Sequence, residues 1–166
     1  MKLILLNGPP AGGKSTLARR YADNHPPALA LDVDRIRAML GGWRSSPAEA
    51  GVLAREIALA AARTHLAAGH DVVVPQLVAR PGFPERLEAV ASECGASFHE
   101  VVLLPGREVV RRRFAARGSS EIEAVVPLTE LELDQAYEAV AAFAASRQVP
   151  VLTAADAYPE LLASLA

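Results

Sequence analysis

The stretch Asn7-Gly8-Pro9-Pro10-Ala11-Gly12-Gly13-Lys14-Ser15-Thr16 follows directly after four apolar residues, 3–6, and precedes a helical pattern. It fits the motif G-x-x-x-x-G-K-[ST] in full. Glycines in such a loop let backbone N–H groups converge on an anion, and the helix that follows adds the positive end of its dipole. An ordinary glycine-rich turn is the alternative, but the position between a buried strand and a helix favours a phosphate-binding loop.

The anion that this loop predicts is a nucleoside triphosphate, and we expect ATP together with Mg²⁺. Lys14 is expected to reach the β- and γ-phosphates, and the Ser15 hydroxyl is expected to coordinate the metal. The other loop residues expected to contact the nucleotide are Gly8, Ala11, Gly12, Gly13 and Thr16.

Apolar runs and helical patterns alternate along the rest of the chain. Runs similar to residues 3–6 recur at 28–33, 71–75, 98–104 and 149–153. Helices are expected between and after them, over 14–24, 34–40, 47–68, 84–94, 108–117, 130–147 and from 158 onward. Residues 46–49 and 129–132 have the form of capping boxes at helix starts. The alternation predicts an α/β fold of three layers around a parallel sheet, as one domain over residues 1–166.

The composition is that of an ordinary globular chain. Its 166 residues are 51% hydrophobic and 22% charged, and a net charge of -2 attracts neither nucleic acid nor anionic membranes. A single cysteine excludes an internal disulfide and favours a cytoplasmic setting. No apolar run approaches the roughly 20 residues that a membrane-spanning helix needs. We therefore expect a cytoplasmic protein that acts on a small molecule, without membrane or nucleic-acid partners.

Two aspartates follow each other closely at the end of the second predicted strand. In open α/β sheets ligands collect at the carboxyl ends of the strands, so Asp32 and Asp34 are expected to face the phosphate loop. Asp34 is the candidate base for a reacting hydroxyl, and the N-cap of the next helix is its alternative role. Arg37, one turn later, is suited to an anionic part of the acceptor or to the transferring phosphoryl group. Asp32 would hold a Mg²⁺-bound water or be a solvated acid.

The phosphate loop, 8–15, together with the stretch 31–37, which reads Leu-Asp-Val-Asp-Arg-Ile-Arg, resembles the P-loop kinases of small hydroxyl-bearing acceptors. This group includes adenylylsulfate kinase, gluconate kinase, chloramphenicol phosphotransferase, zeta toxins and the kinase domain of polynucleotide kinase. The resemblance implies a P-loop NTPase fold whose five-stranded sheet has the phosphate-loop strand at its centre. It also implies that Asp34 acts as the base and that Arg37 touches the acceptor.

The third predicted strand departs from a pattern common among P-loop proteins. It ends in Gln76 and lacks the Walker-B aspartate on which switch GTPases and motor ATPases rely. Kinases of the group above often lack this acid, which leaves Ser15 and phosphate oxygens to hold the metal. Gln76 would then contact the substrate, or be an ordinary polar loop residue. Trp43, just beyond the helix that Asp34 begins, would stack on an acceptor ring or anchor its own loop.

An arginine-rich helix and the segment after it, about 107–128, resemble the short lid of this kinase group. With Val110 and Phe114 on the buried face, Arg113 and Arg117 lie beside that face, four residues apart. Guanidinium groups next to apolar surface need partners, and nucleotide phosphates and the adenine face are suitable ones. A solvated charged face is the alternative. Residues 118–128 would form the moving lid, ordered when nucleotide is bound.

Together these patterns predict an ATP- and Mg²⁺-dependent kinase of a small hydroxyl-bearing molecule such as a sugar, a nucleoside or an antibiotic-like compound. Two rival interpretations stay open. A polynucleotide 5′-kinase would share the lid pattern but would need a basic channel, whereas this chain has only two lysines. A nucleotide-dependent ATPase switch or adaptor would form no phosphorylated small molecule and would bind a partner protein in one nucleotide state.

Overall fold

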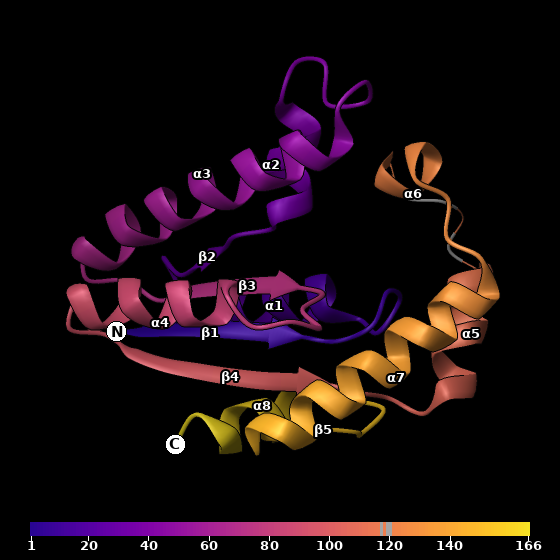
Figure 1. The fold of residues 1–166 in the computed structure, drawn as a ribbon. Coiled ribbons are helices and arrows are strands. Elements are labelled where there is room, and N and C mark those ends of the chain that lie inside the picture. The colour runs from indigo at the N-terminus through magenta and orange to yellow at the C-terminus, as the bar shows by residue number, and fades with distance from the viewer. Residues whose placement is uncertain (117, 119–120) are drawn as a thin grey trace.

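The computed structural model describes residues 1–116, 118 and 121–166. At its centre is a five-stranded sheet in which all neighbouring strands are parallel. Figure 1 shows the strands, in the spatial order β2-β3-β1-β4-β5; they are β1 (Lys2–Asn7), β2 (Leu29–Ala30), β3 (Val72–Gln76), β4 (Ser97–Leu103) and β5 (Val151–Leu152). The phosphate-loop strand β1 is the central strand, which confirms the predicted sheet.

Helices cover both faces of the sheet and give the three predicted layers. The helices α3, α4 and α7 pack on one face, against a core that includes Leu3 and Leu5, while α1 and α8 pack on the other, against Ile4 and Leu6. The described helices are α1 (Lys14–Asn24), α2 (Val33–Met39), α3 (Pro47–Ala67), α4 (Phe83–Glu93), α5 (Arg107–Ala116), α6 (Glu121–Val125), α7 (Glu130–Arg147) and α8 (Tyr158–Ser164).

The burial of β1 explains its continuous apolar sequence. Each of the four residues from Leu3 to Leu6 is 0% exposed. Successive side chains of a strand point to opposite faces, and here both faces are covered by helices, so no position in this run favours a polar residue. The strand therefore holds the phosphate loop from the middle of the fold.

Helix starts were predicted with mixed success. The Thr129 capping box is confirmed, because the Thr129 hydroxyl accepts a hydrogen bond from the Glu132 N–H and the Glu132 carboxylate accepts one from the Thr129 N–H. The capping box predicted at Ser46 is wrong: α3 does begin with Pro47, but the Ser46 side chain makes no capping hydrogen bond. The short helix α6 was not predicted as a helix and lies inside the expected lid segment.

Within the part of the chain that the structure describes, no helix is both long and apolar enough to cross a membrane. The helix α3 has 21 residues, but only one side of it is buried. That side consists of alanines and leucines, most of which pack in the same core as Leu3 and Leu5. The opposite side carries charged residues that face solvent.

Candidate functional site

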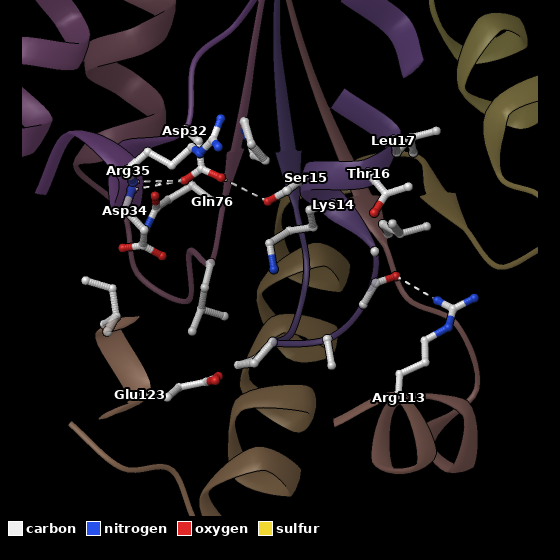
Figure 2. A pocket seen from close by; sticks show the side chains of 18 of the residues that line it. Lys14, Ser15, Thr16, Leu17, Asp32, Asp34, Arg35, Gln76, Arg113 and Glu123 are labelled. Atoms are coloured by element: carbon white, nitrogen blue, oxygen red, sulfur yellow. Dashed lines mark hydrogen bonds between the residues drawn. The ribbon is translucent and has the colours of Figure 1, made fainter. Parts of the chain in front are cut away.

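A wide cleft opens at the carboxyl ends of the strands, as expected for an open α/β sheet. Its volume is about 1670 Å³. The phosphate loop and α1 form its floor, α2 and the end of β3 form one wall, and α5 and the loop after β5 form the other. The helix α6 lies next to α2, which it contacts. Figure 2 shows that Lys14, Asp34 and Glu123 direct their charged groups into this space from three different elements.

The phosphate loop leads into α1 without a side-chain cap. Gly13 takes the N-cap position with a left-handed φ of 101°, which favours glycine because it has no Cβ. No side chain accepts a hydrogen bond from the first N–H groups of α1, so these donors and the positive helix end remain available to an anion. The Lys14 ammonium donates a hydrogen bond to the Pro9 carbonyl at 2.8 Å, within the same loop. The geometry is that of an anion cradle.

Gly8 supports this cradle from beneath rather than lining it. A Cβ at Gly8 would lie 2.5 Å from the Leu103 carbonyl oxygen, so only glycine lets the loop cross the end of β4 this closely. Its N–H donates to the Asn7 side chain at 2.7 Å. Gly8 does not line the cleft and its N–H group is bonded to Asn7, so its observed role is to support the loop, and its expected contact with nucleotide stays a prediction. The other expected contacts do line the cleft: Ala11, Gly12, Gly13, Lys14, Ser15 and Thr16.

Ser15 and Asp32 meet across the cleft floor, as their predicted metal role requires. The Ser15 hydroxyl donates to Asp32 Oδ2 at 3.0 Å (Figure 2). Asp32 Oδ1 accepts from the Asp34 N–H at 3.1 Å, so Asp32 is the N-cap of α2. The alternative role of Asp34 as that N-cap is therefore wrong, since the capping geometry begins two residues earlier.

A magnesium ion would find few protein ligands here. Among the described residues no group of three or more His, Cys, Asp or Glu side chains could hold a metal. One hydroxyl and one carboxylate nevertheless suit Mg²⁺, which keeps several waters and takes its other ligands from substrate phosphates. The pair Ser15 and Asp32 fits that arrangement.

Asp34 is left free to act on a substrate. Its side chain is exposed to solvent, but only within the cleft, so protein atoms of the walls lie around it. Burial between these walls raises the pKa of the Asp34 carboxyl above its usual value, and the neighbouring Asp32 raises it further. Arg37, Lys14 and Arg55 oppose the shift without cancelling it. A carboxylate with a raised pKa holds a proton more readily, which suits a general base.

Two polar groups beside Asp34 have no hydrogen-bond partner among the described residues. The Nε of Arg37 and the Oε1 of Gln76 are buried and form no hydrogen bond. Gln76 lies at the end of β3 and its side chain sits close to Asp32 and Asp34 in Figure 2. Buried polar groups are normally paired, so an unpaired donor and an unpaired acceptor in one cleft point to a ligand.

The structure corrects the prediction for Trp43. Its side chain is only 3% exposed and is not among the residues that line the cleft. The guanidinium group of Arg44 covers the ring at 4.7 Å. Stacking on an acceptor ring is therefore wrong for this position, and the alternative role as a loop anchor agrees with the burial.

Of the two arginines expected in the lid, the structure describes only Arg113. Arg113 lies across from α1 and its Nη1 donates to the Gly12 carbonyl at 3.1 Å, which brings it to the phosphate loop (Figure 2). Arg117 lies outside the described residues. The helix α6 contributes Ile122 and Glu123 to the cleft and Val126 follows it there, so the segment expected to form the lid does face the site.

Sequence reasoning missed two residues that shape the cleft. Asn7 is 0% exposed and its side chain joins the phosphate loop to the loop after β3: Oδ1 accepts from the Gly8 and Val78 N–H groups, and Nδ2 donates to the Val78 carbonyl. A polar residue at the end of an apolar strand was the available signal. Arg55 reaches the cleft from α3, and nothing in its helical pattern distinguished it from other exposed charges.

Comparison with known proteins places the chain in a family. The family model AAA_33, described as an AAA domain, matches residues 3–143, which includes the phosphate loop, α2 and α5. The chain belongs to this family. No curated protein matches the sequence significantly.

Solved structures share the fold of this AAA domain protein at low sequence identity. A chain described as a candidate kinase from Chloroflexus aurantiacus J-10-fl has a TM-score of 0.68 at 21% identity, with 96% of this chain and 87% of the other covered. A gluconokinase from Sinorhizobium meliloti 1021 has a TM-score of 0.66 at 17% identity, with 99% and 90% covered. A chain of the Pnkp1/Rnl/Hen1 RNA repair complex has a TM-score of 0.69 at 15% identity, but only 45% of that chain is covered. These similarities establish a P-loop kinase-like fold.

Proposed function

We propose that the protein is an ATP- and Mg²⁺-dependent kinase that phosphorylates a hydroxyl group of a small molecule. One observation carries the proposal: the Asp34 carboxylate opens into the same cleft as the phosphate loop and the Lys14 ammonium (Figure 2). A carboxylate that faces a triphosphate site across a cavity is what proton removal from an acceptor requires. The family and the fold agree with a nucleotide-dependent kinase.

The residues present fit ATP and Mg²⁺. The uncapped start of α1 and the Lys14 ammonium offer donors and positive charge to phosphates, while Ser15 and Asp32 offer two oxygen ligands to a metal. When bound, Mg²⁺ would neutralise charge on the phosphate oxygens and so make the terminal phosphorus easier to attack. The guanidinium group of Arg113 donates a hydrogen bond to the Gly12 carbonyl, and this contact with the phosphate loop brings it near the place of a bound phosphate.

In the proposed reaction the acceptor oxygen forms a bond to the γ-phosphorus, and the bond from that phosphorus to the β–γ bridging oxygen breaks, which releases ADP. The proton of the acceptor hydroxyl passes to Asp34. Its raised pKa makes the carboxylate a better proton acceptor than an ordinary aspartate would be. Arg37 and Gln76 orient the acceptor through the buried Nε and Oε1, which form no hydrogen bond with any residue that the structure describes.

The deciding experiment removes only the proposed base. Asp34→Asn keeps the size of the side chain, so ATP binding should stay nearly intact while kcat falls about 10²–10⁴-fold, the usual contribution of a general base. The activity is first found by screening sugars, nucleosides, aminoglycosides and other antibiotics for ADP release above background hydrolysis. Asp23→Asn is the matched control, since Asp23 is exposed on α1 and does not line the cleft.

Turnover by Asp34→Asn at the parental rate would contradict the role of Asp34. Absence of ADP release with every small acceptor, combined with phosphorylation of a 5′-hydroxyl end of single-stranded DNA or RNA, would favour the polynucleotide kinase instead. ATP hydrolysis without any acceptor product would favour a switch or adaptor.

A further inference from the structure

Two arginines from different helices face Asp34 in the cleft. Arg37 lies on α2, one turn after Asp34, and its guanidinium group packs against α3, where a Cβ on Gly51 would lie 3.9 Å from it. Arg55 extends from α3, with its guanidinium carbon 6.0 Å from the centre of the Phe83 ring. Both are near enough to Asp34 to lower the pKa of its carboxyl. The acceptor side of the cleft is thus lined by two cations.

Neither arginine forms an ion pair within the described part of the chain. Other arginines on the same layer of helices do: Arg63 pairs with Glu93 at 2.8 Å, and Arg86 pairs with Glu56 at 2.5 Å. Neighbouring arginines thus form ion pairs with carboxylates, whereas Arg37 and Arg55 form none with the described residues. Two guanidinium groups without counter-ions beside a cavity form a binding surface for an anion.

Asp34 does not satisfy this pair of cations. No ion pair joins its carboxylate to either arginine. Asp32, two residues before Asp34, is occupied by the Ser15 hydroxyl and by the N–H groups at the start of α2. Positive charge on this wall therefore exceeds what the neighbouring carboxylates balance through contact.

The buried Oε1 of Gln76 adds a second requirement for the ligand. An amide oxygen accepts hydrogen bonds and cannot donate them, so its unpaired state calls for a hydroxyl or N–H group on the ligand. The buried Nε of Arg37 conversely calls for an acceptor such as a carboxylate or phosphate oxygen. One molecule that carries both hydroxyls and an anionic group would satisfy both atoms.

We propose that the phosphate acceptor is an anionic alcohol, a hydroxylated molecule bearing a carboxylate or a phosphate group, and that Arg55 determines this preference together with Arg37. The inference rests on the proposed kinase function and specifies its substrate class. Arg55 contacts the anionic group from α3, Arg37 contacts it from α2, and Gln76 accepts a hydrogen bond from a hydroxyl. The hydroxyl that reacts lies against Asp34.

The first test compares related acceptors with and without an anionic group. D-gluconate is paired with D-glucitol, D-glycerate with glycerol, and ribose 5-phosphate with ribose, and kcat/KM is measured for each from ADP release. A charge-assisted contact contributes about 1.5–3 kcal/mol, so the charged member of a productive pair should be preferred about 10–100-fold. The carboxylate and phosphate pairs show which anion the site takes. Equal use of both members, or a preference for the neutral one, would overturn the proposal.

The second test assigns the preference to Arg55. In Arg55→Gln the ratio of kcat/KM for the charged over the neutral acceptor should fall about 10–100-fold, mainly through KM for the charged acceptor, and Arg55→Lys should restore part of it. Arg112→Gln is the matched control, because Arg112 is exposed on α5 and does not line the cleft. An unchanged ratio in Arg55→Gln would remove Arg55 from the site.

Failure of the kinase function can be told apart from failure of the anion site. If no acceptor raises ADP release, binding of D-gluconate and ribose 5-phosphate is measured calorimetrically with a non-hydrolysable ATP analogue and Mg²⁺ saturating the phosphate loop. Binding that weakens at least about tenfold in Arg55→Gln, but not in Arg112→Gln, would support the anion site without the kinase. Absence of binding to both probes would overturn the anion site as well.

Discussion

Asn7 shows how one side chain connects the two halves of the cleft. It ends β1, precedes Gly8, and holds both the N–H and the carbonyl of Val78 at 2.8 Å. The loop that follows β3 borders the acceptor side, whereas Gly8 belongs to the phosphate loop. A buried asparagine can satisfy three backbone groups at once because its amide combines an acceptor with two lone pairs and a donor. The phosphate loop and the loop after β3 are thus fixed to each other through this residue.

Asn7→Ala would leave these three backbone groups buried without partners. Each unsatisfied group costs about 1–3 kcal/mol, so we expect the free energy of unfolding to fall by about 3 kcal/mol or more, measured by urea denaturation. Asn24→Ala is the control, since the Asn24 amide bonds only the Arg20 carbonyl at an exposed helix end and its loss should cost about 0.5 kcal/mol or less. Equal losses in the two variants would show that the Asn7 bridge contributes no special stability.

At the scale of elements, the sequence predicted those helix boundaries that depend on the residues next to them. The helix α1 begins and ends where predicted, because the glycine-rich loop precedes Lys14 and Pro26 follows Asn24 closely. The role of Asp32 as the N-cap of α2 was missed because Asp32 and Asp34 are the same type of residue. Only the backbone geometry shows which of the two caps the helix. Trp43 was open to two roles for a similar reason: burial depends on tertiary packing, which no local spacing reports.

Three further elements are joined by one arginine at the end of α7. Arg147 Nε donates to Glu100 Oε2 on β4 at 2.7 Å, and its Nη1 pairs with Glu85 on α4. Glu100 is 7% exposed, and its Oε1 accepts no hydrogen bond from the described part of the chain. Burial raises the pKa of the Glu100 carboxyl, although Arg147 acts in the opposite direction. The ionised form of Glu100 is therefore less favourable in the folded protein than in the unfolded chain.

This shift has a definite sign for stability. A carboxyl whose folded pKa is raised binds its proton more tightly in the folded state, so its contribution to stability is lost as pH rises through the folded pKa. Glu100→Gln cannot titrate, and its free energy of unfolding relative to the parent should therefore increase as pH rises from about 4 to about 8. Urea denaturation across this range measures the difference. Glu93→Gln, at the exposed Arg63 pair, is the control; a difference for Glu100→Gln that is flat with pH, or that decreases, would contradict the expectation.

At the scale of the whole molecule, the order of strands explains why the cleft holds residues from distant parts of the sequence. The central strand β1 lies between β3 and β4. The strands of the first half of the chain, β2 and β3, therefore lie on one side of β1, and those of the second half, β4 and β5, lie on the other. The helix α2 and the end of β3 lie on the first side, and α5 and the loop after β5 lie on the second. The helix α6 follows α5 in the sequence but reaches back to contact α2 (Figure 1). The residues next to a motif were predictable, whereas Arg55 reaches the cleft only because α3 packs against α2.

Nucleotide binding to this cleft should stabilise the entire fold, because the ligand binds the folded state alone. At a concentration of ATP–Mg²⁺ near 100 times its dissociation constant, the stabilisation is about 2.7 kcal/mol, which for a domain of 166 residues corresponds to a rise in Tm of about 5–10 °C. Lys14→Ala should lose most of this rise, since it removes the cation of the phosphate loop. Asp34→Asn should keep it, because Asp34 acts on the acceptor. Thermal unfolding with and without ATP and Mg²⁺ measures both variants beside the parent. An equal rise in Lys14→Ala would mean that ATP binds elsewhere on the molecule.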